Sequence, residues 1–128
     1  MTYKDIEKYT DKICSRYGLP GNLFAGSCSG NSNKSRFNIN AQTDGWRKRL
    51  AQAKFAIMYI EEDDRYIVWE NYPDRLTFYL SKKDYLAAQN CSTGFTLKGK
   101  GYKAWGEERV WVLTPEQLEQ FIANIANQ

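Results

Sequence analysis

Four carboxylates between residues 62 and 70 are of the type that metal-dependent chemistry needs. They are Glu62, Asp63, Asp64 and Glu70. Metal-dependent nucleases hold Mg²⁺ between an acid at a hairpin and an acid that is followed two residues later by lysine. Here the residue two positions after Glu70 is Tyr72, so this lysine is absent. A Mg²⁺-dependent nuclease that uses Asp64 and Glu70 is therefore one alternative, and a charged structural corner is the interpretation that we favour.

The chain lacks the residues on which other common catalytic and metal-binding sites depend. The chain has no histidine, so it has neither the commonest general base nor the commonest metal ligand. Its three cysteines, Cys14, Cys28 and Cys91, are far apart and form no CxxC pair, which argues against structural zinc. The phosphate-binding pattern GxxxxGK[ST] is also absent. We expect no catalytic residue, no metal site and no cofactor.

Basic residues are interleaved with aromatic and amide residues in three segments, a mixture that suits nucleic-acid binding. Lysine and arginine contact phosphates, asparagine and arginine read base edges, and aromatic rings stack on unpaired or flipped bases. The expected phosphate contacts are Lys34, Arg36, Arg47, Lys48, Arg49, Lys98, Lys100 and Lys103. The expected base contacts are Asn38, Trp69, Tyr102 and Trp105. A merely solvated charged surface is the competing interpretation.

Charge and composition agree with a polyanionic partner. The net charge is only +3, but residues 1–54 carry ten Lys or Arg against four Asp or Glu. Residues 55–81 reverse this balance, with two against six. Aromatic residues form 15% of the chain, more than a minimal core requires, and such rings suit binding faces.

The hairpin at 55–72 is the centre of the expected fold. Two runs of aromatic and β-branched residues, Phe55–Ile60 and 66–69, flank the acidic turn. Alternation predicts further strands at Arg36–Asn40, at 76–80 and on either side of a turn within 102–114. We expect 76–80 to be a third strand of the hairpin's own sheet.

Four helices are expected around these strands. The first carries an apolar stripe through Ile6 and Ile13 and ends at Gly18. A short helix at 45–54 would turn Ala53 inward and Arg49 outward. A third covers 82–89, with Tyr85, Leu86 and Ala87 towards the core. The last follows a Thr-Pro-Glu-Gln start at 114–117. The order predicts one α+β domain over residues 1–128, with a curved, mainly antiparallel sheet or pseudobarrel flanked by terminal helices.

A resemblance to a known family rests on three short runs, WRKRL at 46–50, AKFA at 53–56 and YIVWEN at 66–71. Together they are similar to accessory DNA-recognition domains of restriction endonucleases, including those that act on modified cytosine. The resemblance covers residues 46–80. It implies a twisted sheet or pseudobarrel that presents loops to DNA, and catalysis carried by a larger polypeptide or a partner subunit.

We therefore expect a DNA-binding module, such as the target-recognition or modified-base-recognition domain of a restriction or defence system. A protein-interaction adaptor or inhibitor is the remaining alternative. The charged N-terminus lacks signal-peptide character, and no apolar run reaches the roughly 20 residues of a membrane span. These two observations, together with an odd number of widely spaced cysteines, predict a reduced, cytoplasmic protein.

Overall fold

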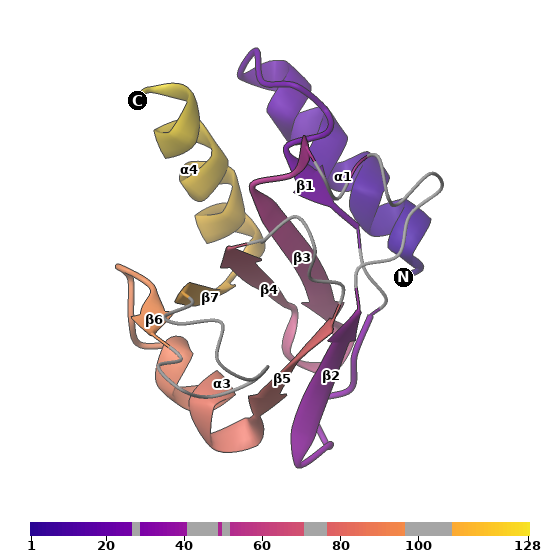
Figure 1. The fold of residues 1–128 in the computed structure, drawn as a ribbon, viewed down its shortest axis with the longest axis vertical. Helices are drawn as coiled ribbons and strands as arrows, with labels where there is room; N and C mark the ends of the chain where they lie inside the picture. The colour runs from indigo at the N-terminus through magenta and orange to yellow at the C-terminus, as the bar shows by residue number, and fades with distance from the viewer. Residues whose placement is uncertain (27–28, 41–48, 50–51, 71–76, 97–108) are drawn as a thin grey trace.

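The computed structural model describes residues 1–26, 29–40, 49, 52–70, 77–96 and 109–128 (Figure 1). Its helices are α1 (Tyr3–Arg16), the 3₁₀ turn η1 (Glu61–Asp63), α3 (Lys82–Ala88) and α4 (Pro115–Ala126). Its strands are β1 (Phe24–Ala25), β2 (Arg36–Asn40), β3 (Phe55–Ile60), β4 (Arg65–Glu70), β5 (Thr77–Ser81), β6 (Phe95–Thr96) and β7 (Arg109–Leu113).

The strands form two separate sheets. The larger has the order β1-β3-β4-β7-β6, in which only the short β1–β3 pair is parallel. The smaller is the antiparallel ribbon β2–β5, with Asn38 opposite Tyr79 and Phe37 opposite Leu80. The predicted α+β class and mainly antiparallel pairing are confirmed. Among the described strands the sheet does not close into a barrel, so the pseudobarrel version of the prediction is wrong.

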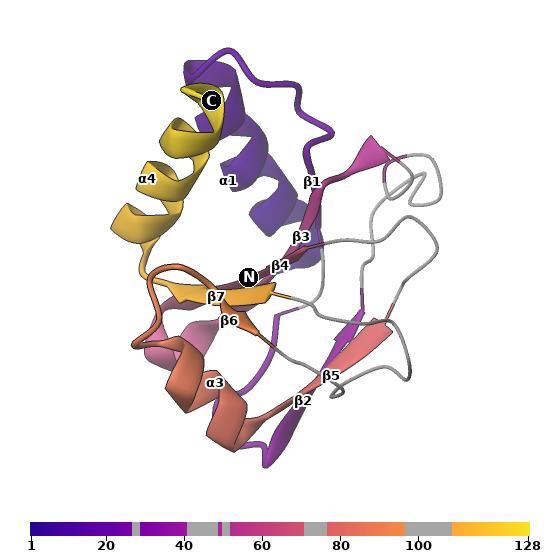
Figure 2. The ribbon, with the colours of Figure 1, turned by 60° about the vertical axis from the view of Figure 1, so that its left-hand side comes forward.

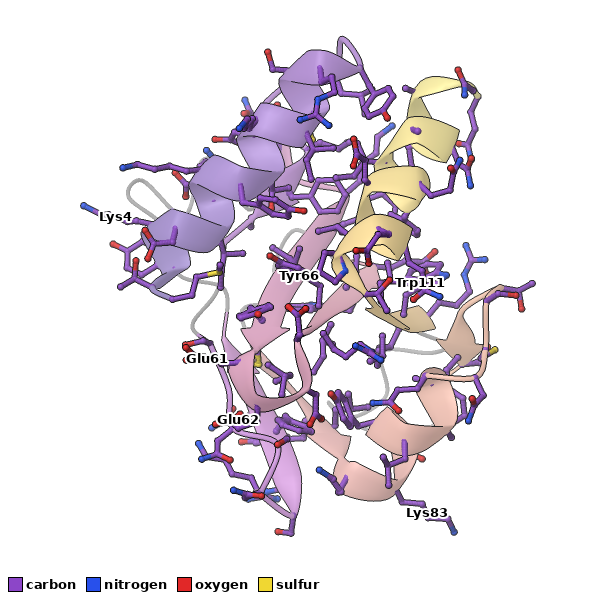
Figure 3. All side chains as sticks on the ribbon, turned by 180° about the vertical axis from the view of Figure 1, so that it is seen from behind. Lys4, Glu61, Glu62, Tyr66, Lys83 and Trp111 are labelled. Carbon is purple, nitrogen blue, oxygen red and sulfur yellow. The ribbon has the colours of Figure 1, made fainter. Side chains whose placement is uncertain are left out.

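Each face of the large sheet is covered by its own layer. Helices α1 and α4 lie side by side over one face, and α3 with the β2–β5 ribbon lies on the other (Figures 1 and 2). Successive residues of a strand point to opposite faces of the sheet, so alternate residues pack against the two layers. Ile57 and Val68 pack under α1 and α4, whereas Met58 and Ile67 pack towards the ribbon. Tyr66 and Trp111 lie between the sheet and the terminal helices (Figure 3).

The helices are capped by residues near their own ends. Thr2 and Asp5 form a capping box at the start of α1, and Thr114 and Gln117 form another at α4. Gly18, just past α1, has φ +73°, a conformation that residues with a Cβ adopt rarely. Within α3 the prediction was partly wrong. Tyr85 is buried, but Leu86 is 48% exposed and Ala87 is exposed too, because the next residues around a short helix face away from the core.

The prediction that 76–80 extends the hairpin's sheet is wrong. β4 pairs instead with β7, and β5 pairs with β2. The physical reason lies in burial. Residues Val110 to Leu113 of β7 are buried on both faces, as an interior strand needs, whereas β2 and β5 each carry polar residues on one side.

The prediction that Trp69 contacts a base is also wrong. It lies on the central strand β4, is 2% exposed, and packs in the core beneath the ribbon. Because β4 has a neighbouring strand on each edge and a packed layer on each face, the Trp69 side chain is not accessible to a ligand. The base-contact assignment of Trp69 is therefore withdrawn.

No helix in the described part of the chain combines the length and the apolar character needed to cross a bilayer.

Candidate nucleic-acid interface

The β2–β5 ribbon has one core face and one exposed face. Phe37 and Leu80 are buried, and the Phe37 ring centroid lies 4.8 Å from that of Tyr85 in α3. Because side chains alternate across a strand, Arg36, Asn38 and Tyr79 occupy the opposite face. That alternation is what places polar residues together on the outside of the ribbon.

Cationic, amide and aromatic side chains lie together on the exposed face. The Arg36 guanidinium carbon lies 4.8 Å from the centroid of the Tyr79 ring, which is a cation–π contact. Tyr79 is 37% exposed. Asn38 is exposed and lies directly opposite Tyr79 in the register. Exposed Lys34 stands two residues before the strand. Neither strand contains an acidic residue, so this face, which we call the ribbon face (Lys34, Arg36, Asn38 and Tyr79), has a basic character.

The turn that carries Lys34 into the ribbon is fastened to the hairpin and to α3. The Ser32 backbone N–H donates to Glu62 Oε2 at 3.2 Å, and the Ser32 carbonyl accepts from the Lys82 ammonium. Within the turn, the Lys34 N–H donates to the Asn31 carbonyl at 3.2 Å. The acidic hairpin therefore helps to position the basic segment beside it.

The remaining acids of the hairpin also have structural partners. The Tyr85 hydroxyl donates to Asp63 at 2.8 Å, and the Tyr59 hydroxyl donates to Asp64 at 2.6 Å. Arg65 donates to the backbone carbonyls of Asp63 and Asp64. These bonds support the interpretation of the turn as a charged structural corner.

The geometry rejects a metal site shared by Asp64 and Glu70. Asp64 precedes β4 and Glu70 ends it, so their backbones are roughly 20 Å apart at about 3.3 Å per residue. Two ligands of one Mg²⁺ each lie about 2.1 Å from the ion. Glu70 instead accepts two hydrogen bonds from Arg109, at 2.6 and 3.1 Å. The nuclease alternative that uses this pair is wrong.

Arg49 is engaged inside the protein, contrary to the expectation that it faces phosphate. Its Nη2 donates to the carbonyls of Gly21 and Phe24 at 2.8 Å each. Its guanidinium also lies 3.5 Å from carboxylate oxygens of Glu7 and Asp11. Its side chain is only 20% exposed. Arg49 thus joins helix α1 to the start of β1, and its role as a phosphate contact is withdrawn.

Seven of the predicted contact residues lie outside the described part of the chain. They are Arg47, Lys48, Lys98, Lys100, Tyr102, Lys103 and Trp105. Most of the helix predicted at 45–54 falls there too, although Ala53 is buried as expected. The roles proposed for these residues stay predictions.

Tyr79 is the residue that sequence reasoning missed. The alternation at 76–80 already placed Tyr79 on the face opposite Leu80. Only the long-range pairing of β2 with β5 brings it beside Arg36 and Asn38.

A groove of about 320 Å³ lies between α4, β7 and the segment after α3. Trp111 and Phe121 line it together with several amide side chains. Among the described residues that line the groove, Cys91 is the one titratable side chain, so these residues offer no acid–base pair.

Comparison of the chain with protein-family models, with curated proteins and with solved structures finds no match in any of the three.

Proposed function

We propose that this protein is a DNA-binding module and that the ribbon face is part of its binding surface. The observation that carries the proposal is the exposed strand face with Arg36 and Asn38, preceded by exposed Lys34, on strands without acidic residues. Cations there neutralise phosphates, and the Asn38 amide can donate to and accept from a base edge. We propose binding without catalysis, because Glu62, Asp63 and Asp64 of the hairpin accept hydrogen bonds from other parts of the protein.

The setting is that of a recognition domain in a restriction or defence system, as the resemblance of residues 46–80 implies. A larger polypeptide or a partner subunit would carry catalysis. The free thiols of Cys14 and Cys91 support a reducing, cytoplasmic location.

Salt-dependent DNA binding tests the proposal. Fluorescence anisotropy with labelled single-stranded and duplex DNA should show affinity at low salt and a linear fall of log K with log salt. The double variant Lys34→Ala/Arg36→Ala should weaken binding and reduce the magnitude of the salt slope by about 1.5, as expected when two phosphate contacts are lost.

The matched control is Lys8→Ala/Lys12→Ala, which removes the same charge from exposed positions on α1, across the sheet from the ribbon. It should bind as the unaltered protein does. Absence of DNA affinity at low salt, or equal weakening by both double variants, would reject the proposal. Recovery of a single protein partner after nuclease treatment would favour the adaptor alternative instead.

A further inference from the structure

We infer that the ribbon face binds an unpaired nucleobase within a single strand, in preference to a base-paired duplex. This inference rests on the proposed function and specifies the ligand of the same surface. It comes from the relation of three side chains, Tyr79, Arg36 and Asn38.

The first step concerns the shape that Tyr79 and Arg36 offer. The guanidinium lies across the ring at 4.8 Å from its centroid, while more than a third of Tyr79 stays exposed. The pair therefore presents flat π surfaces, a guanidinium plane and part of a phenol ring. Aromatic rings and arginine planes of this kind stack on the faces of unstacked bases.

The second step concerns which nucleic acid can use such a surface. Inside a duplex the faces of each base are covered by its neighbours, and a protein reaches only base edges in the grooves. A stacking surface is therefore of use only to a base that is unpaired or extruded from the helix.

The third step concerns the groups around the stack. Asn38 is the direct cross-strand partner of Tyr79, and the Cβ atoms of such partners lie about 5 Å apart. Its amide supplies two donors and one acceptor next to the ring, as the edge of a stacked base requires. Lys34 and Arg36 supply positive charge for the flanking phosphates, and both strands lack an opposing carboxylate.

The test uses one mixed-sequence oligonucleotide in three forms, as single-stranded DNA, as duplex DNA and as single-stranded RNA. 2-Aminopurine replaces one base as a stacking probe. We expect the full chain to bind the single strand at least about tenfold more tightly than the duplex and to quench the probe, since a stacked base is worth about 1–3 kcal/mol and each 1.4 kcal/mol is tenfold.

Two variants of Tyr79 separate stacking from folding. Tyr79→Phe keeps the ring and should keep both affinity and quenching. Tyr79→Leu keeps a strand-compatible apolar side chain and should lose about tenfold in single-strand affinity together with the quenching. Tyr17→Leu is the matched control, because Tyr17 is 38% exposed but lies at the end of α1. Thermal unfolding verifies that each variant is folded.

The outcomes distinguish this inference from the proposed function. DNA binding without single-strand preference, or unchanged quenching in folded Tyr79→Leu, overturns the inference and leaves the proposed function standing. Binding of RNA alone supports stacking and shows the DNA assignment to be wrong. No binding to any form overturns both.

Discussion

The Tyr85 hydroxyl donates a hydrogen bond to Asp63 Oδ2 at 2.8 Å, which ties helix α3 to the corner between β3 and β4. Tyr85 is fully buried, and its ring contacts Phe37 of the ribbon. Burial, and then the hydrogen bond to Asp63, raise the pKa of Tyr85. One side chain thus connects the acidic corner, α3 and the core face of the ribbon.

We predict that Tyr85→Phe lowers the free energy of unfolding by about 1–2 kcal/mol, because the partly buried hydrogen bond to Asp63 is lost while ring packing is kept. Urea denaturation measures the change. Asp63→Asn, which keeps an acceptor oxygen, should cost less. Equal stability of Tyr85→Phe and the unaltered protein would show that the bond contributes nothing.

The Tyr59–Asp64 hydrogen bond should make stability sensitive to alkaline pH. This bond, then burial, raises the pKa of Tyr59 from 10.0 to about 12. Because the folded pKa exceeds the unfolded one, the stabilisation is complete below pH 10 and is lost as pH rises towards 12. Unfolding experiments across this range should show a shallower decline for Tyr59→Phe. An identical decline would assign the effect to other tyrosines.

Arg49 should matter for stability and not for DNA binding. Arg49→Ala removes donors to two backbone carbonyls and leaves Asp11 without its cation, so we expect a loss of about 2–4 kcal/mol. The matched control is Arg16→Ala. Arg16 forms an exposed ion pair with Glu119, which is worth at most about 1 kcal/mol.

Denaturation and anisotropy together decide the role of Arg49. The folded Arg49→Ala protein should bind DNA as the unaltered chain does. A stable variant with weakened binding would restore Arg49 to the interface.

Cys14 should resist alkylation in the folded protein. Burial raises the pKa of its thiol to about 11, and the thiolate is the reactive form. Mass spectrometry after brief iodoacetamide treatment at pH 8 should find Cys14 unmodified, with the half-buried Cys91 as an internal comparison. In denaturant Cys14 should react. Rapid modification of Cys14 without unfolding would contradict its burial in the core.

Local patterns in the sequence determined the elements of this protein. The capping signal at Thr114 satisfies backbone N–H groups within a few residues, so no distant partner is required. The alternation of β2 and the runs on both sides of the acidic turn likewise depend on neighbouring residues, and those strands formed where expected.

Tertiary structure alone decided which of the candidate residues are exposed. Trp69 and Tyr79 are both aromatic residues in strands, and what separates them is the pairing of those strands. β4 received neighbours on both edges and layers on both faces, which buried Trp69, whereas β5 joined β2 at the surface and exposed Tyr79 beside Arg36. Arg49 was drawn inward by carbonyls 25 and 28 residues away in the chain. Such long-range pairing depends on competition between all strands for burial, which local spacing does not encode.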